Sequence, residues 1–132
     1  VDEDTNSFNK IMEAMRLPKG SDSEKASRKQ AMDDATKYAI LTPFRVMETS
    51  LASMDIIKQM AEIGNPNSVT DAGVGALCAR TAVIGAFLNV KINCMDFDDT
   101  AFVTDILAKG ETVMAKAIAL EQEILKITMD KI

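Results

Sequence analysis

The sequence predicts an all-α protein, an antiparallel helical bundle of about five helices with two long central helices. Hydrophobic residues make up 47% of the chain and aromatic residues 5%, and Ala, Met, Leu and Ile outweigh Thr, Tyr and Trp, which is a helical composition. Apolar residues recur at helical rather than strand spacing, and N-cap residues precede them. With 132 residues, the chain has the length of one helical domain that buries a core.

Two helices are expected before residue 42. The first spans residues 2 to 16 and ends at Pro18 and Gly20, because proline disfavours helical geometry in the residue before it. The second is capped by Ser21 or Ser23, and Ser21 and Glu24 have the spacing of a capping box. It runs to about residue 41, and its charged first half is interpreted as a solvated face.

The pair Thr42-Pro43 predicts the start of a third helix, since an N-cap followed by Pro at the first helical position is a favoured beginning. This helix is expected to end at Gly64. A methionine-rich stripe along it is either a ligand-adaptable surface or, more commonly, core; the stripe consists of Val46, Met47, Leu51, Met54, Ile57 and Met60.

A fourth, unusually apolar helix is predicted from Asp71 to about Met95, with Thr70 as its N-cap and the Asp71 carboxylate favourably placed in the first turn. Its breadth of apolar surface indicates a central position. One line of small side chains follows it, with polar residues at both ends: Asp71, Gly75, Cys78, Ala82, Gly85, Ala86, Asn89 and Asn93. Close helix packing explains the small residues, whereas two buried amides would require a partner or a ligand.

The acidic connection from residue 96 to 100 is interpreted as carboxylates at a helix start, because the twelve-residue calcium loop is not present. The last helix is expected from about residue 99 to 131. Four of its apolar residues recur at heptad spacing: Ile106, Val113, Leu120 and Ile127.

Composition excludes several functions. A net charge of −5 argues against a nucleic-acid partner, and the absence of histidine excludes His-based catalysis and His metal sites. Cys78 and Cys94 lie about 24 Å apart on the predicted helix, so they cannot pair within it and are expected to be reduced thiols of a cytoplasmic protein. No apolar run of 18 residues lacks a charge or an amide and no signal peptide is recognised, so no membrane association is expected.

Two segments have the pattern of a known family: residues 64–74, GNPNSVTDAGV, and residues 85–93, GAFLNVKIN, with matching spacing between them. Upstream, residues 14–19 (AMRLPK) and several single residues recur in the same order, namely Asp4, Phe8, Glu24, Arg28 and Pro43. In these features the chain resembles the formiminotetrahydrofolate cyclodeaminase and methenyltetrahydrofolate cyclohydrolase family over essentially its whole length.

The resemblance implies folate one-carbon chemistry. A cyclodeaminase closes the formimino group to the methenyl bridge with loss of ammonia, and a cyclohydrolase opens that bridge with water. The tetrahydrofolate derivative is the substrate, and neither a metal nor another cofactor is expected. The family's N-terminal helices have no counterpart here, so the chain corresponds to the C-terminal two-thirds of the domain. A site that needs those helices would be incomplete, and the alternative is a non-catalytic dimerisation or scaffold module.

The resemblance also assigns candidate site residues. Asp71 is the candidate acid/base or pterin anchor, with a helix-dipole carboxylate as the structural alternative. The other candidates are substrate-binding groups: Asn65, Asn67, Thr70, Asn89, Asn93, Lys19 and Asp4. Most of them also have a purely structural explanation. This is turn formation for Asn65 and Asn67, helix capping for Thr70, helix packing for Asn89 and Asn93, and an ordinary exposed position for Lys19.

Spacing along the central helix constrains this site. Asp71 and Asn89 lie about 27 Å apart on an ideal helix, too far to hold one small substrate. Either they serve different purposes, or a homodimer sets two such helices antiparallel and brings Asp71 of one chain near Asn89 or Asn93 of the other.

Overall fold

The computed structural model describes residues 2–132 and confirms the all-α class. The described chain contains four α-helices rather than about five: α1 (Asp2–Met15), α2 (Asp22–Ile63), α3 (Val69–Cys94) and α4 (Thr100–Met129), with a short 3-10 helix, η1 (Pro66–Ser68), between α2 and α3.

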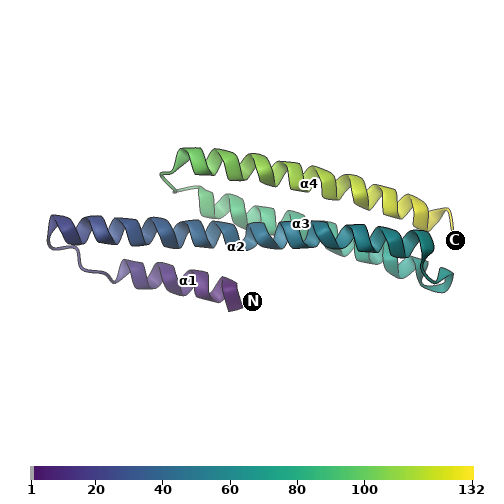
Figure 1. The fold of residues 1–132 in the computed structure, drawn as a ribbon, viewed down its shortest axis with the longest axis horizontal. Coiled ribbons are helices and arrows are strands. Elements are labelled where there is room, and N and C mark those ends of the chain that lie inside the picture. The colour runs from purple at the N-terminus through teal and green to yellow at the C-terminus, as the bar shows by residue number, and fades with distance from the viewer. Residues whose placement is uncertain (1) are drawn as a thin grey trace.

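Consecutive helices run in opposite directions, and the molecule is elongated along α2 (Figure 1). Helix α2, with 42 residues, packs against all three of the other α-helices, while α1 lies along only its first part. The prediction of two long central helices therefore requires correction. Three long helices, α2, α3 and α4, form the body of the bundle, and the short α1 is an addition to one side.

Helix α2 is continuous through Pro43, so the predicted break between residues 41 and 42 is wrong. Proline in a helix leaves the carbonyl four residues earlier without its usual donor. In this structure the side-chain amide of Asn93 donates to the Ala39 carbonyl at 2.9 Å. The local start signal at Thr42-Pro43 is overridden because a residue of another helix satisfies the freed acceptor.

The connection between α1 and α2 follows the sequence prediction. Ser21 caps α2, and a complete capping box joins it to Glu24. The guanidinium of Arg28 donates to the Met15 carbonyl at 3.3 Å, which satisfies an acceptor at the end of α1. These contacts hold α1 antiparallel to α2.

The start of α3 differs from the prediction at Thr70. The helix begins at Val69 with Ser68 at the N-cap and without a side-chain cap hydrogen bond, so Thr70 is inside the first turn and is not the cap. The preceding η1 explains the difference, because its backbone already turns the chain. The Asn65 side chain accepts from the Asn67 N–H at 3.1 Å and so caps η1 instead.

The core lies where α2, α3 and α4 meet. Met47 and Met54 are fully buried, which assigns most of the methionine-rich stripe to the core, although Met60 is exposed. Helix α4 contributes Ile106 and Ile124 to the core. A side chain at Gly110 would overlap the Phe87 ring, so this glycine lets α4 approach α3 closely.

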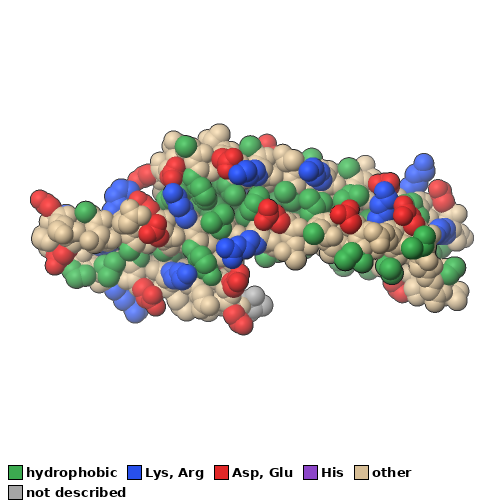
Figure 2. Space-filling view, viewed as in Figure 1, with side chains coloured by type: hydrophobic (Ala, Val, Ile, Leu, Met, Phe, Trp, Pro, Cys, Tyr) green, Lys and Arg blue, Asp and Glu red, His purple; other side chains and the backbone are tan. Residues whose placement is uncertain are grey.

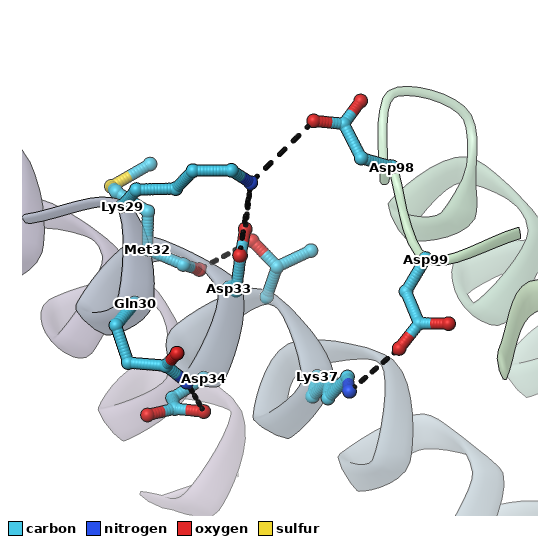
Figure 3. Close-up of polar contacts among 9 residues, drawn as sticks. Lys29, Gln30, Met32, Asp33, Asp34, Lys37, Asp98 and Asp99 are labelled. Atoms are coloured by element: carbon cyan, nitrogen blue, oxygen red, sulfur yellow. Dashed lines mark hydrogen bonds and ion pairs between the residues drawn. The ribbon is translucent and has the colours of Figure 1, made fainter. Parts of the chain in front are cut away.

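The acidic connection begins α4 as expected. The Asp99 side chain accepts from the Phe102 N–H at 3.1 Å and forms an ion pair with Lys37 of α2 at 2.7 Å. Lys29 makes a second, longer contact with Asp98 at 3.6 Å (Figure 3). These pairs fasten the connection to α2.

Helix α3 is apolar but not enclosed. Its buried side packs on α2 and α4, whereas Val74, Leu77, Leu88 and Ile92 on the outer side are exposed. In the described residues, Pro66–Cys94 is the one segment long and apolar enough to span a membrane, and 39% of its most apolar window is buried inside the structure. Hydrophobic side chains also fill the seam between α2 and α4 (Figure 2).

Candidate functional site

A cleft of about 900 Å³ lies between the N-terminal turn of α1, the middle of α2 and the outer side of α3. It brings together two of the residues singled out from the sequence, Asp4 and Asn89, which are 85 positions apart in the chain. The complete lining comprises Asp2, Glu3, Asp4, Thr42, Pro43, Arg45, Val46, Thr49, Ser50, Ala82, Ala86 and Asn89.

The cleft exists because α3 presents small side chains to it. Ala82 and Ala86 leave space beside α2 that longer side chains would fill. Around this apolar floor stand four kinds of polar group: carboxylates from α1, hydroxyls and the Arg45 guanidinium from α2, and the amide of Asn89. Such a site can hold a flat polar ring against its apolar wall and offer hydrogen bonds at the rim.

Charge is mixed at the α1 side of the cleft. Arg45 lies 4.0 Å from Glu3, and both side chains are exposed. The carboxylate accepts hydrogen bonds and the guanidinium donates them, so this side of the cleft can bind polar groups of either kind. Asn89 is exposed as well, and its amide nitrogen donates to the Gly85 carbonyl of its own helix at 3.1 Å.

The two amides of α3 are exposed, contrary to the expectation that they are buried and therefore require a partner or a ligand. Asn89 faces the cleft, and Asn93 is exposed while its amide bonds to Ala39. Asn93 is absent from the cleft lining. Asn93 thus makes a contact with a partner helix, as its structural alternative expected, and its role toward a substrate stays a prediction.

The remaining candidates lie away from the cleft. Asn65, Asn67, Thr70 and Asp71 are all exposed near η1, at the opposite end of α3 from Asn89. Asn65 forms the turn, as its bland alternative required. Within one chain, Asp71 and Asn89 do not share a site.

Lys19 lies in a third region, the turn between α1 and α2. It lines a pocket of about 480 Å³ with Lys25, Arg28, Lys29, Met32 and Asp98. Two of these cations are paired, Lys25 with Asp22 at 3.2 Å and Lys29 with Asp33 at 3.0 Å. The basic side chains are therefore partly neutralised by neighbouring carboxylates.

Sequence reasoning missed the α2 wall of the cleft. Thr42, Arg45, Thr49 and Ser50 recur at helical spacing opposite the buried methionines, and this polar stripe is the signal that could have identified them. The false helix break at Pro43 concealed it by dividing the stripe.

The thiols and carboxylates add no metal centre to this cleft. No group of three Asp, Glu or Cys side chains in residues 2–132 is arranged to hold a metal ion. Cys78 is exposed and Cys94 is buried, both unpaired, and burial raises the pKa of the Cys94 thiol.

Comparison with known proteins identifies the family of this helical chain. The profile of the formiminotransferase-cyclodeaminase family matches residues 1–112. The chain belongs to this family.

The relatives differ in their named activities. The chain is 34% identical over 132 residues to a methenyltetrahydrofolate cyclohydrolase of Methylorubrum extorquens, covering 100% of the chain and 64% of that protein. It is 34% identical to a formimidoyltransferase-cyclodeaminase of Dictyostelium discoideum, covering 97% of the chain and 23% of that protein.

A solved structure has the same fold. The crystal structure of a formiminotetrahydrofolate cyclodeaminase from Thermotoga maritima superposes with a TM-score of 0.80 at 23% identity, over 97% of this chain and 60% of that one. The chain thus spans less than two thirds of the length of each of these proteins.

Proposed function

We propose that this chain supplies folate-binding and catalytic groups for one-carbon chemistry, as a methenyltetrahydrofolate cyclohydrolase or a formiminotetrahydrofolate cyclodeaminase. The observation that carries this proposal is the cleft, which joins Asp4 of α1 and Asn89 of α3 around an apolar floor of alanines. Family membership supports it. The tetrahydrofolate derivative is the substrate, and no further cofactor takes part.

The cleft offers groups suited to either reaction. In the hydrolytic direction, water adds to the methenyl carbon and gives one proton to a carboxylate. The bond from that carbon to N5 then breaks as N5 takes up the hydroxyl proton, which leaves a formyl group on N10. In the deaminating direction, N10 attacks the formimino carbon and loses its proton, and the leaving nitrogen receives that proton and one more from an acid, so that ammonia departs. Asn89 would hold a polar edge of the pterin, and Asp4 would be the carboxylate that exchanges the proton.

Spectrophotometry of the methenyl chromophore tests the proposal with either methenyl- or formimino-tetrahydrofolate as substrate. Asn89→Ala and Asp4→Asn are expected to lower kcat/KM by about tenfold to a thousandfold, whereas Glu111→Gln, exposed on α4, should leave it unchanged. The chain and a version extended with the N-terminal region of a relative are assayed together. Absence of turnover in both would contradict an enzymatic role and favour the scaffold alternative. That alternative is motivated by the length of the relatives, of which the chain covers only a part.

We further propose that the chain forms a homodimer through the outer side of α3. The described chain exposes 8251 Å², whereas a compact monomer of 14.3 kDa exposes about 6,800 Å². The excess, about 1,450 Å² per chain, is of the size that a stable homodimer interface covers on each partner. Val74, Leu88 and Ile92 on this side are each about 60% exposed.

A two-fold axis near residue 80 would pair these helices antiparallel. The stripe of small residues permits close approach of two backbones, since a side chain at Gly85 would meet nothing within 4 Å and the exposed side chains of Cys78 and Ala82 are short. Asp71 of one chain would then lie opposite Asn89 of the other, at the edge of the cleft. This arrangement gives Asp71 the catalytic role that a single chain denies it.

Disulfide trapping tests this arrangement. In the antiparallel pairing, residue 78 of one chain faces residue 82 of the other, so Ala82→Cys is expected to cross-link to Cys78 between chains on mild oxidation. Glu111→Cys on α4 is the matched control and should not cross-link to Cys78. A monomeric mass at high protein concentration in sedimentation, with no cross-link, would contradict the dimer.

The unpaired thiols fit the cytoplasmic location that we also propose.

A further inference from the structure

We infer that Asn93 is a positioning residue that supplies the hydrogen bond Pro43 withholds, and so sets the course of α2 along the cleft. Three observations meet at this point. Pro43 lies inside α2, the Ala39 carbonyl is the acceptor that its missing N–H would have served, and the Asn93 amide nitrogen lies 2.9 Å from that carbonyl oxygen.

The acceptor benefits from this donor because the hydrogen bond between them is part-buried. Ala39 is 7% exposed and Pro43 is buried, so water has little access to the carbonyl between them. An unsatisfied buried acceptor is costly, and the usual outcome at a helical proline is a kink. A side-chain amide from a neighbouring helix removes the cost without restoring the backbone bond.

Neighbouring hydroxyls complete the junction. The Thr42 hydroxyl donates to the Tyr38 carbonyl at 3.0 Å and lies 3.1 Å from the buried Ser7 hydroxyl of α1. The backbone around Pro43 is therefore tied to α1 through Thr42 and to α3 through Asn93. Thr42 and Pro43 both line the cleft.

Asn89 and Asn93, one turn apart on α3, therefore have different roles. Asn89 lines the cleft and bonds only to its own helix in the described contacts. Asn93 bonds across to α2 and holds the cleft wall opposite Asn89. The inference concerns folding and geometry, so it stands independently of the proposed folate activity.

A double-mutant cycle in the full chain tests it, with Asn93→Ala, Pro43→Ala and the double variant. Asn93→Ala is expected to lower the folding equilibrium constant about tenfold to a hundredfold in denaturant titration, because the Ala39 carbonyl loses its donor. In the Pro43→Ala background, residue 43 has its own N–H for that carbonyl, so the same change should cost less than about threefold. Asn93→Asp, which has the same shape but no donor, should behave as Asn93→Ala.

Two further measurements separate this role from general packing. The carbonyl ¹³C resonance of Ala39 should shift in Asn93→Ala and return toward its original position in the double variant, whose amide at residue 43 should be protected from hydrogen exchange. Asn89→Ala is the matched control, and its effect on stability should not depend on residue 43. An equal cost of Asn93→Ala with proline and with alanine at position 43 overturns the inference. If Asn93→Ala does not fold, a folded double variant supports it and an unfolded double variant overturns it.

Discussion

At the scale of single residues, two glycines in equivalent helical settings have opposite surroundings. A side chain added at Gly110 would overlap the Phe87 ring, whereas one added at Gly85 would meet nothing within 4 Å. Both lie inside helices, so the loss of backbone freedom on folding is similar for each. Only the packing differs, and packing therefore decides whether a substitution by alanine stabilises or destabilises the protein.

Gly110→Ala is expected to destabilise the protein by about 1–3 kcal/mol, because the methyl group forces α4 or the Phe87 ring to move. Gly85→Ala should be neutral or stabilise by up to about 1 kcal/mol, through helix propensity. Chemical denaturation of both variants, in dilute solution where the chain is monomeric, checks the contrast. Equal effects of the two substitutions would contradict the packing at Gly110.

The Asp99–Lys37 pair makes stability depend on pH. The bond from Lys37, followed by that from the Phe102 N–H, lowers the pKa of Asp99, and the bond to Asp99 raises the pKa of Lys37. The Asp99 contribution is therefore complete above the ordinary carboxyl value and is lost as the pH falls through the lowered one. The Lys37 contribution is complete below the ordinary lysine value and is lost as the pH rises through the raised one.

Asp99→Asn isolates this charge, because asparagine is also a good N-cap. The variant should have a lower Tm than the original protein at neutral pH, by a small amount since both side chains are 39% exposed. The difference should disappear in strong acid, where Asp99 is protonated. Thermal melts at the two pH values test this, and a difference that persists in acid would assign the effect to the cap.

At the scale of elements, α3 and α4 are joined by one charged contact inside an apolar seam. Glu121 of α4 is buried, with its side chain 8% exposed, and Arg80 of α3 lies 3.6 Å away with 40% of its side chain exposed. The Arg80 Nε is buried without a hydrogen-bond partner among the described residues. A pair of this kind is sensitive to the loss of one member, which leaves the other charge buried.

Arg80→Met should therefore cost about 2 kcal/mol, less than a fully enclosed pair because Arg80 is partly solvated. The double variant Arg80→Met with Glu121→Leu should recover most of this loss, since no buried charge remains. Urea unfolding of the single and double variants measures the coupling. Simple additivity of the two substitutions would contradict it.

At the scale of the whole molecule, the exposed apolar side of α3 links assembly to the candidate site. In the dimer that we propose, Cys78 lies in the interface, whereas Cys94 is buried within each chain. Burial also raises the pKa of Cys94, so its thiol stays protonated and slow to react. The reactivity of Cys78 therefore reports on dimer formation, and the reactivity of Cys94 in the same chain is the internal reference.

Alkylation of Cys78 should consequently slow as protein concentration rises, while alkylation of Cys94 stays slow throughout. Mass spectrometry of peptides after timed labelling follows both thiols in one sample. Ile92→Glu, which places a charge in the exposed apolar side, should abolish the concentration dependence. A Cys78 rate that is constant over a thousandfold range of concentration would count against the dimer.

The sequence by itself determined the all-α class, the capping box at Ser21 and the carboxylate start of α4, because these depend on local spacing and short-range hydrogen bonds. The family was recognised from the resemblance of two sequence segments. Tertiary structure decided the rest. Pro43 stays inside a helix because Asn93, 50 residues later, satisfies the carbonyl that it frees. The same holds for the candidate site. Asp4 and Asn89 could be predicted as candidates from the sequence, but only the packing of α1, α2 and α3 brings them into one cleft and leaves Asp71 outside it.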